Sequence, residues 1–294
     1  MLSLLIPTVA QGLLWALMAL GVYVTFRVLD IADLTVEGSF PLGAATAASM
    51  MVAGFGPLTA LLAAFVAGML AGVVTGLLHT KMKIPALLAG ILTMIALYSV
   101  NLRIMGKANL SLLGVDTAFK IAKSALDLSM TQTTLVVGLA VTLIVGFFMY
   151  WFFGTQIGAA IRATGFNQQM IRAQGIDTDI TIILGLLLSN GLVAVSGALV
   201  AQSNGFSDVG MGTGTIVIGL ASVIIGEVLF GTRSFKNCLI SVVLGSIVYR
   251  IVIAAVLAMG MPPNDLKLFT SVLVALALSM PLIKAKMGGR KAVR

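Results

Sequence analysis

Long apolar runs separated by short polar connections occupy almost the whole of this chain. Of its 294 residues, 59% are hydrophobic and only 10% are charged, and the mean hydropathy is +1.11. Because a soluble domain carries about 25% charged residues, this composition predicts a protein that crosses a membrane several times. Each run must be a helix, since unpaired backbone groups are too costly in lipid and the sequence lacks the alternation of a membrane β-barrel.

Hydropathy predicts about nine transmembrane helices (eight to ten), most of them close to the ~20 residues that cross a bilayer. The expected spans are residues 4–26, 40–53 (a short one), 58–78, 84–104, 131–153, 180–201, 213–230, 238–259 and 266–283. We therefore predict a single all-α membrane domain over residues 1–294, with an external loop at 105–130 and a basic tail at 284–294. No room is left for a soluble catalytic domain, so the chain is not expected to be an enzyme.

The distribution of lysine and arginine predicts the orientation, because short cytoplasmic loops are enriched in both residues. A cytoplasmic C-terminus places most of them inside, and with an odd number of spans the N-terminus then lies outside. The expected inner set is Arg27, Lys81, Lys83, Arg162, Arg172, Arg233, Lys236, Lys284, Lys286, Arg290, Lys291 and Arg294, against Arg103, Lys107, Lys120, Lys123 and Lys267 outside. This bias explains most of the net charge of +8, so we expect contact with the lipid bilayer and no nucleic-acid partner.

Two patterns of small residues bear on packing. Gly68, Gly72 and Gly76 repeat every four residues in the third expected span, which predicts close contact between helices of the same chain rather than a dimer seam. The spans before and after 131–153 also start in opposite directions, and each set holds an Asp-containing, Gly-rich stretch, at 33–43 and 208–219. An inverted repeat would explain this arrangement.

One polar segment, residues 155–178, lies between two apolar runs on the expected cytoplasmic side. Asn167 is suited to begin a helix and Gly175 to the left-handed position that ends one, which predicts a helix of about two turns between them. Gly165 is expected to break an upstream helix that continues out of the fifth span.

A helix of two turns is too short to be stable alone in water, so it needs a partner surface. Met170, Ile171 and Ala173 can supply apolar contacts and Arg172 a charged one. The alternative is an ordinary loop lying on lipid headgroups, and residue spacing alone does not separate these two interpretations.

Charged residues inside the expected membrane region are functional hypotheses by default. Asp33 and Glu37 precede the short second span and would share one helix face if that stretch is helical. Pro41 indicates that a helix starts or breaks nearby. One interpretation is a broken helix whose carboxylates face the transport pathway. The other, which we favour for Asp30, is a cytoplasmic turn whose carboxylates pair with Arg27.

Glu227 lies near the cytoplasmic end of its span, where it could pair with Arg233, cap a helix or line an inner gate. Arg250 lies near the middle of the following span. It could extend to the membrane surface, line the pathway and face a substrate carboxylate there, or pair across a subunit interface. Since the chain has one Cys and one His, a Cys/His metal site is not expected.

Three sequence motifs resemble those of ABC importer permeases that serve branched-chain amino acids, ribose and similar sugars, and nucleosides. The first, G-x-A-x-R-A-x-G-x-N-x-x-M-x-R-A-x-G-I at residues 158–176, resembles the coupling loop of that family. The second, DIADLTVEGSFPLGA at 30–44, is closest to an amino-acid subgroup, some members of which are linked to tryptophan. The third is GTGTIVIGLASVIIGEVLFG at 212–231. The residues that the resemblance assigns to ATPase coupling are Gly158, Arg162, Gly165, Asn167, Met170, Arg172 and Gly175.

The resemblance implies a multi-pass protein of the bacterial cytoplasmic membrane that works by alternating access. Its expected partners are a second permease copy, two cytoplasmic ATP-binding subunits and an extracytoplasmic solute-binding protein. This chain lacks the G-x-x-x-x-G-K-[ST] loop that cradles nucleotide phosphates, so ATP and Mg would be bound by the partner subunits. The expected substrate is an amino acid, with a sugar or nucleoside as the alternative. An ion-driven secondary transporter and a membrane receptor or scaffold remain open.

Overall fold

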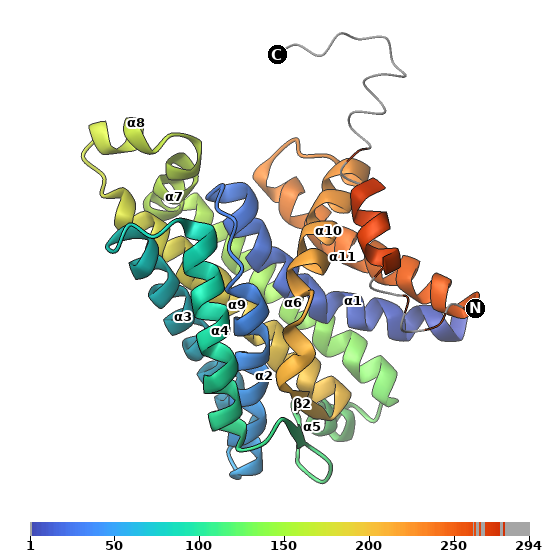
Figure 1. Ribbon diagram of the computed structural model, residues 1–294. Helices are drawn as coiled ribbons and strands as arrows, with labels where there is room; N and C mark the ends of the chain where they lie inside the picture. Colours follow the sequence, from blue (N-terminus) through green and yellow to red (C-terminus); the bar gives the residue numbers. More distant parts are fainter. Residues whose placement is uncertain (1, 261, 263–264, 266–267, 277–278, 280–294) are drawn as a thin grey trace, which may run out of the picture.

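The computed structural model describes residues 2–260, 262, 265, 268–276 and 279. These residues form a helical bundle with one small antiparallel strand pair (Figure 1). The elements are α1 (Leu2–Tyr23), the π-helix η1 (Val24–Val28), α2 (Val36–Val52), α3 (Pro57–Thr80), α4 (Ala86–Met105), β1 (Asn109–Ser111), α5 (Ala118–Leu126), α6 (Met130–Gly154), α7 (Gln156–Phe166), α8 (Gln168–Ala173), α9 (Thr178–Asn204), β2 (Phe206–Asp208), the 3-10 helix η2 (Val209–Gly212), α10 (Thr215–Phe230) and α11 (Phe235–Ala258).

Seven helices among the described residues are long and apolar enough to cross a membrane. The second expected span forms α2, which has 17 residues and is shorter than those seven. Of the ninth expected span, residues 268–276 are helical, and most of the remainder lies outside the described residues, as does the expected tail at 284–294. The count of nine spans, the outside N-terminus and the inverted repeat therefore stay predictions.

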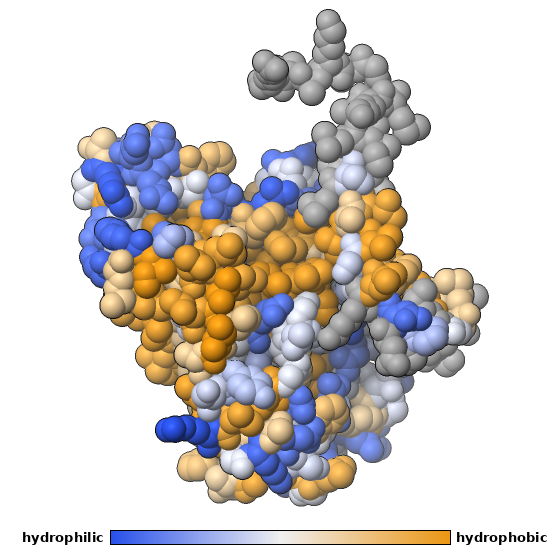
Figure 2. Space-filling view, in the orientation of Figure 1, coloured by the Kyte–Doolittle hydropathy of each residue, from blue (hydrophilic) through white to orange (hydrophobic). Residues whose placement is uncertain are grey.

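The surface has an apolar band between two more polar ends (Figure 2). Helices α7 and α8 lie at one end, and the strand pair with α5 lies at the other (Figure 1). Large apolar side chains such as Leu70 on α3, Leu92 on α4 and Phe147 on α6 are more than half exposed in the band. A soluble protein rarely exposes so continuous an apolar surface, so these side chains are placed to face lipid or other membrane subunits.

Helix α9 is the central element, and nearly its whole length is buried against α1, α2 and α3. Glycines bring the helix backbones into contact there. A β-carbon added to Gly76 would lie 2.9 Å from Ile183 of α9, and Gly68 and Gly72 lie even closer to the α9 backbone. The prediction that this glycine ridge serves packing within the chain is confirmed.

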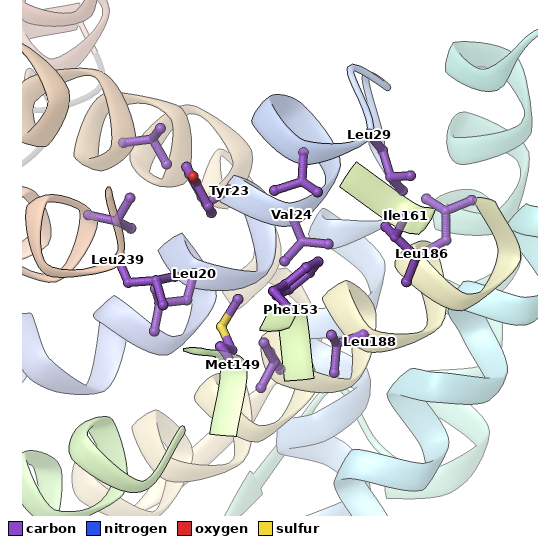
Figure 3. Packing of buried hydrophobic residues seen from close by; sticks show 14 of the residues in the cluster. Leu20, Tyr23, Val24, Leu29, Met149, Phe153, Ile161, Leu186, Leu188 and Leu239 are labelled. Carbon is purple, nitrogen blue, oxygen red and sulfur yellow. The ribbon is translucent and has the colours of Figure 1, made fainter. Parts of the chain in front are cut away.

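A second cluster of buried apolar side chains joins α7, at one polar end of the bundle, to the membrane helices (Figure 3). The end of α1, η1, α6, α7, α9 and α11 all contribute buried apolar side chains to it. The labelled members include Tyr23, Val24, Leu29, Phe153, Ile161, Leu186 and Leu239. Because Ile161 belongs to α7, the segment that follows the fifth span is held by the same core that holds the membrane helices.

Candidate functional site

The fifth expected span, residues 131–153, ends where it was predicted, but its helix does not continue into the polar segment. Helix α6 stops at Gly154, and Thr155 adopts an extended conformation (φ −75°, ψ 166°) that separates α6 from α7. The Thr155 hydroxyl then accepts a hydrogen bond from the Gly158 amide at 3.3 Å and caps α7. A β-carbon at Gly158 would collide with the backbone of Phe152 and Phe153. The expectation of one continuous helix is therefore wrong, because Thr155 starts a new one.

Gly165 does not break a helix, contrary to the sequence-based expectation. Helix α7 continues through it to Phe166, and the chain turns only at Asn167 (φ −159°, ψ 99°). A β-carbon at Gly165 would overlap the carbonyl group of Val28 and would lie 3.0 Å from the Cα of Leu29. Gly165 is thus a point of close approach between α7 and the end of η1.

The short capped helix predicted from Asn167 and Gly175 is confirmed as α8, Gln168–Ala173. The Asn167 side-chain oxygen accepts a hydrogen bond from the Met170 amide at 3.0 Å, and Gly175 takes the left-handed conformation with φ +83°. Met170 is exposed, as a partner contact requires. Ile171 is buried within the chain, so its predicted role as a partner contact is wrong.

Phe166 is an exposed aromatic residue that the sequence interpretation missed. Its side chain is 94% exposed at the junction of α7 and α8. An apolar residue immediately before a helix cap commonly packs on the residue four positions into the helix, which is Ile171 here. The exposure of Phe166 shows that this local contact is not made. The signal available in the sequence was an aromatic residue directly preceding Asn167.

Arg172 holds α8 to the start of α9. Its Nε donates to the Thr178 hydroxyl at 2.6 Å, and its terminal nitrogen lies 3.5 Å from a carboxylate oxygen of Asp179. The ammonium group of Lys81 lies 3.2 Å from the same carboxylate, and that of Lys83 lies at 3.9 Å. Basic residues from the α3–α4 connection and from α8 therefore meet at one acidic group on this polar end.

Arg162 joins α7 to the start of α11. Its guanidinium lies 5.3 Å from the centre of the Phe235 ring, a cation–π distance. The Nε atom is buried and has no hydrogen-bond partner among the described residues. Among the residues assigned to coupling, Gly158, Arg162 and Gly165 thus contact the bundle, while Met170 faces outward.

The two carboxylates expected to share a helix face are separated. Helix α2 begins at Val36, so Asp33 lies before it. Asp33 is buried and accepts hydrogen bonds from the Thr35 amide at 2.9 Å and from the Asn190 side-chain nitrogen at 2.8 Å. Glu37 instead accepts from the Gly214 amide at 3.0 Å, across the bundle. Asp33 therefore joins α9, and Glu37 joins the start of α10.

Glu227 pairs with Arg27 rather than with Arg233. Two hydrogen bonds of 2.9 and 3.0 Å join the Arg27 Nε to the Glu227 carboxylate, and a terminal nitrogen of Arg27 also contacts it. This pair joins the π-helix η1 to the end of α10. Because it uses Arg27, the alternative pairing of that arginine with Asp30 is not formed.

Arg250 lies on the indole ring of Trp15, with its guanidinium carbon 4.0 Å from the ring centre. Its Nε is buried without a hydrogen-bond partner in the described part of the chain. A cation over an indole face is the strongest of the common cation–π pairs. The sequence interpretation had considered the membrane surface, the pathway and a subunit interface for Arg250, and it did not include this contact between α1 and α11.

A cavity of about 450 Å³ lies between α2, α4 and the η2–α10 region. Its polar lining residues include Glu37, Tyr98, Ser99, Asn101 and Thr213. Of the four charged residues proposed to line a pathway, Glu37 is the one in this cavity. Sequence reasoning missed Asn101, although an asparagine within an apolar span was a visible signal.

Comparison with known proteins agrees with this architecture. Residues 4–279 match the family described as branched-chain amino acid transport system / permease component. The chain is 41% identical over 273 residues to the tyrosine transport system permease protein of Clostridioides difficile (strain R20291), covering 93% of this chain and 90% of that protein. It is 31% identical over 268 residues to the galactofuranose transporter permease protein YtfT of Escherichia coli (strain K12), covering 90% and 75%.

A solved ABC transporter structure in an inward-facing conformation superimposes with a TM-score of 0.50 and 15% sequence identity, covering 96% of this chain and 85% of that one. At this identity the likeness concerns the fold alone. The match over residues 4–279 and the 41% identity to a permease establish the family. This chain therefore belongs to the family of branched-chain amino acid transport system permease components, as a multi-pass protein of the bacterial inner membrane.

Proposed function

We propose that this chain is the transmembrane permease subunit of an ATP-driven importer for a small solute, with an aromatic amino acid as the first candidate. Two copies would form the pathway, two cytoplasmic ATP-binding subunits would drive it, and a solute-binding protein would deliver the substrate from outside. The family match supports the permease role, and the tyrosine permease relative supports the substrate class.

The α7–α8 segment is the observation that carries the proposal. One side of it is fixed to the bundle through Ile161, Gly165 and Arg162. Its other side presents Phe166, which is almost fully exposed, and Met170, which is about half exposed, at a polar end of the molecule. An exposed aromatic side chain directly before a short capped helix is suited to fill an apolar pocket of a partner subunit.

The same contacts supply a route for motion. In the proposed cycle, ATP binding closes the two ATPase subunits and displaces α8. Because Arg162 contacts Phe235 and Gly165 contacts the end of η1, the displacement would reach the start of α11 and the end of α1. Rotation of these helices would change which side of the membrane the pathway faces.

The interface prediction is tested with two exposed apolar residues at opposite ends of the bundle. Phe166 is 94% exposed beside α8, and Leu113 is 87% exposed in the loop that follows β1. Co-purification with the ATP-binding subunit should be lost in Phe166→Ala and retained in Leu113→Ala. Retention in Phe166→Ala together with loss in Leu113→Ala would refute both the interface and the proposed orientation.

Proteoliposomes that enclose ATP test the energy source. Uptake of L-tyrosine in the presence of the solute-binding protein should require enclosed ATP and should survive ionophores that collapse ion gradients. Uptake that needs an ion gradient and no ATP would indicate the alternative, a secondary transporter. Because another relative is a galactofuranose permease, calorimetric titration of the solute-binding protein with L-tyrosine and with galactofuranose separates the two substrate classes.

A further inference from the structure

The cavity between α2, α4 and the η2–α10 region interrupts the apolar surface of the bundle. Its volume of about 450 Å³ lies within the ~300–1,000 Å³ typical of small-molecule sites. In Figure 2, hydrophilic and neutral colour lies between α4 and α10 and continues toward the polar lower end of the molecule. A cavity with an apolar lining and a few polar groups is typical of a site for a small organic solute.

Glu37 places a carboxylate in this cavity. The residue belongs to the first turn of α2, and the Gly214 amide donates to its Oε1 at 3.0 Å. That hydrogen bond comes from the residue that precedes α10, so it holds the carboxylate in a defined position between two helices. Glu37 is the one charged residue among the described residues that line the cavity.

Asn101 supplies a second acceptor. Its side-chain nitrogen donates to the backbone oxygen of Gly38 at 3.3 Å. Only the amide nitrogen can donate to a carbonyl oxygen, so this contact fixes the orientation of the amide group. The Oδ1 atom is then left buried with no hydrogen-bond partner in the part of the chain that the structure describes. Buried acceptors are normally bonded, so this atom can still accept a hydrogen bond from a donor that the described residues do not supply.

The backbone donors near the cavity are already engaged. The Gly214 amide at the start of α10 donates to Glu37, and the Gly210 amide in η2 donates to the Asp208 carboxylate at 2.7 Å. Helix starts of this kind would otherwise attract an anion. Carboxylates already occupy both positions, and the described lining residues include Glu37 and no basic residue. The charge in the cavity therefore favours a cationic group over a carboxylate or phosphate.

We propose that this cavity binds the ammonium group of the transported solute, with the Glu37 carboxylate as counter-charge and Asn101 Oδ1 as a second acceptor. An ammonium group carries three donors and no acceptor, so the acceptors on α2 and α4 would take up two of its three donors. The inference rests on the proposed transport function and says where the amine of the proposed amino-acid substrate binds. A sugar has no ammonium group to fill the site.

The test uses a thiol introduced into the cavity of the complete complex of permease and ATP-binding subunits in lipid nanodiscs, without ATP. Ser99 lines the cavity and is exposed. The chain's single cysteine, Cys238, is first replaced by Ser. The reaction rate of Ser99→Cys is then measured with a cationic and an anionic methanethiosulfonate reagent, with and without L-tyrosine.

We expect the cationic reagent to react faster than the anionic one, and L-tyrosine to slow the reaction. 3-(4-Hydroxyphenyl)propanoate, which lacks the ammonium group, should give no protection. Glu37→Gln keeps an oxygen that can accept from Gly214, so the fold is retained. In this variant the cationic reagent should lose its advantage in rate over the anionic one. The affinity of L-tyrosine, measured by its protection of the thiol, should fall by about tenfold, equivalent to ~1.4 kcal/mol. Asp116→Asn removes an equal charge outside the cavity and should change neither quantity.

The proposal is overturned if Glu37→Gln leaves both the reagent preference and the protection unchanged, or if the propanoate protects as well as L-tyrosine. The importer assignment is tested separately by ATP-driven uptake in proteoliposomes. Uptake without amine-dependent protection would refute this site and leave the importer standing. Amine-dependent protection without ATP-driven uptake would support the site and refute the importer.

Discussion

The substitution Gly165→Ala tests whether the close approach of α7 to η1 transmits motion. A β-carbon at Gly165 would lie 2.8 Å from the carbonyl carbon of Val28 and still closer to its oxygen, whereas ordinary van der Waals contacts lie at 3.4–4 Å. The obstructing atoms belong to the backbone, so no side-chain rotation relieves the overlap. Helix α7 must therefore move away from η1 by at least about 0.6 Å, and further to clear the oxygen.

The expected cost follows from two opposing effects. Overpacking of this kind costs about 1–3 kcal/mol, and alanine regains about 1 kcal/mol over glycine inside a helix. Gly146 in α6 provides the matched control, because a β-carbon there meets no atom within 4 Å. Gly146→Ala should gain the helix propensity without the overlap. The free energies of unfolding of the two variants should therefore differ by about 1–3 kcal/mol.

Two assays separate stability from coupling. Thermal unfolding in detergent should give a lower melting temperature for Gly165→Ala than for Gly146→Ala. In proteoliposomes, Gly165→Ala should retain the ATP-binding subunit, since Phe166 and Met170 are unchanged, while less solute is taken up per ATP hydrolysed. Wild-type stability together with wild-type uptake per ATP would refute the reasoning, because it would mean that α7 can move away from η1 without consequence.

Three further predictions concern contacts between helices. Asn190→Ala removes the donor to the buried Asp33 carboxylate and should lower the free energy of unfolding by about 1–3 kcal/mol or more; an unchanged melting temperature would contradict this. For Arg27 and Glu227, a double-mutant cycle should give a coupling energy of only ~0–1 kcal/mol, because the arginine is 46% exposed; a coupling of several kcal/mol would show that the pair is shielded from solvent in the assembled complex. Trp15→Leu removes the aromatic face under Arg250 and should lower the free energy of unfolding by about 2 kcal/mol, whereas Trp15→Phe should lower it less. Equal melting temperatures of the two variants would exclude the cation–π contribution.

The local structure of the α7–α8 segment was largely predictable from the sequence. Asn167 and Gly175 each act through their own backbone neighbourhood, so their capping roles follow from residue type alone. The break at Thr155 rests on the same local capping chemistry, which the sequence interpretation overlooked. The close contact at Gly165 was not predictable in this way. A glycine can serve as a helix breaker or as a site of close packing, and only the position of η1 against α7 separates these roles.

For the charged residues too, the sequence predicted one part and the tertiary contacts decided the other. Sequence indicated that Asp33, Glu37, Glu227 and Arg250 are unusual in a membrane, because charge there is costly. It did not indicate their partners, which come from distant segments such as Asn190, Gly214, Arg27 and Trp15. Which residues become neighbours is decided by how the helices cross.

By itself, the sequence determined that the chain is a bundle of membrane helices with a capped polar segment between two spans, since hydropathy and capping act over a few residues. Only the tertiary structure decided that α9 is the centre, that Phe166 is left exposed beside α8, and that Glu37 and Asn101 meet at one cavity. The physical reason is that lipid makes every span helical regardless of its neighbours, whereas a cavity or an ion pair requires side chains from several helices to come within hydrogen-bond distance.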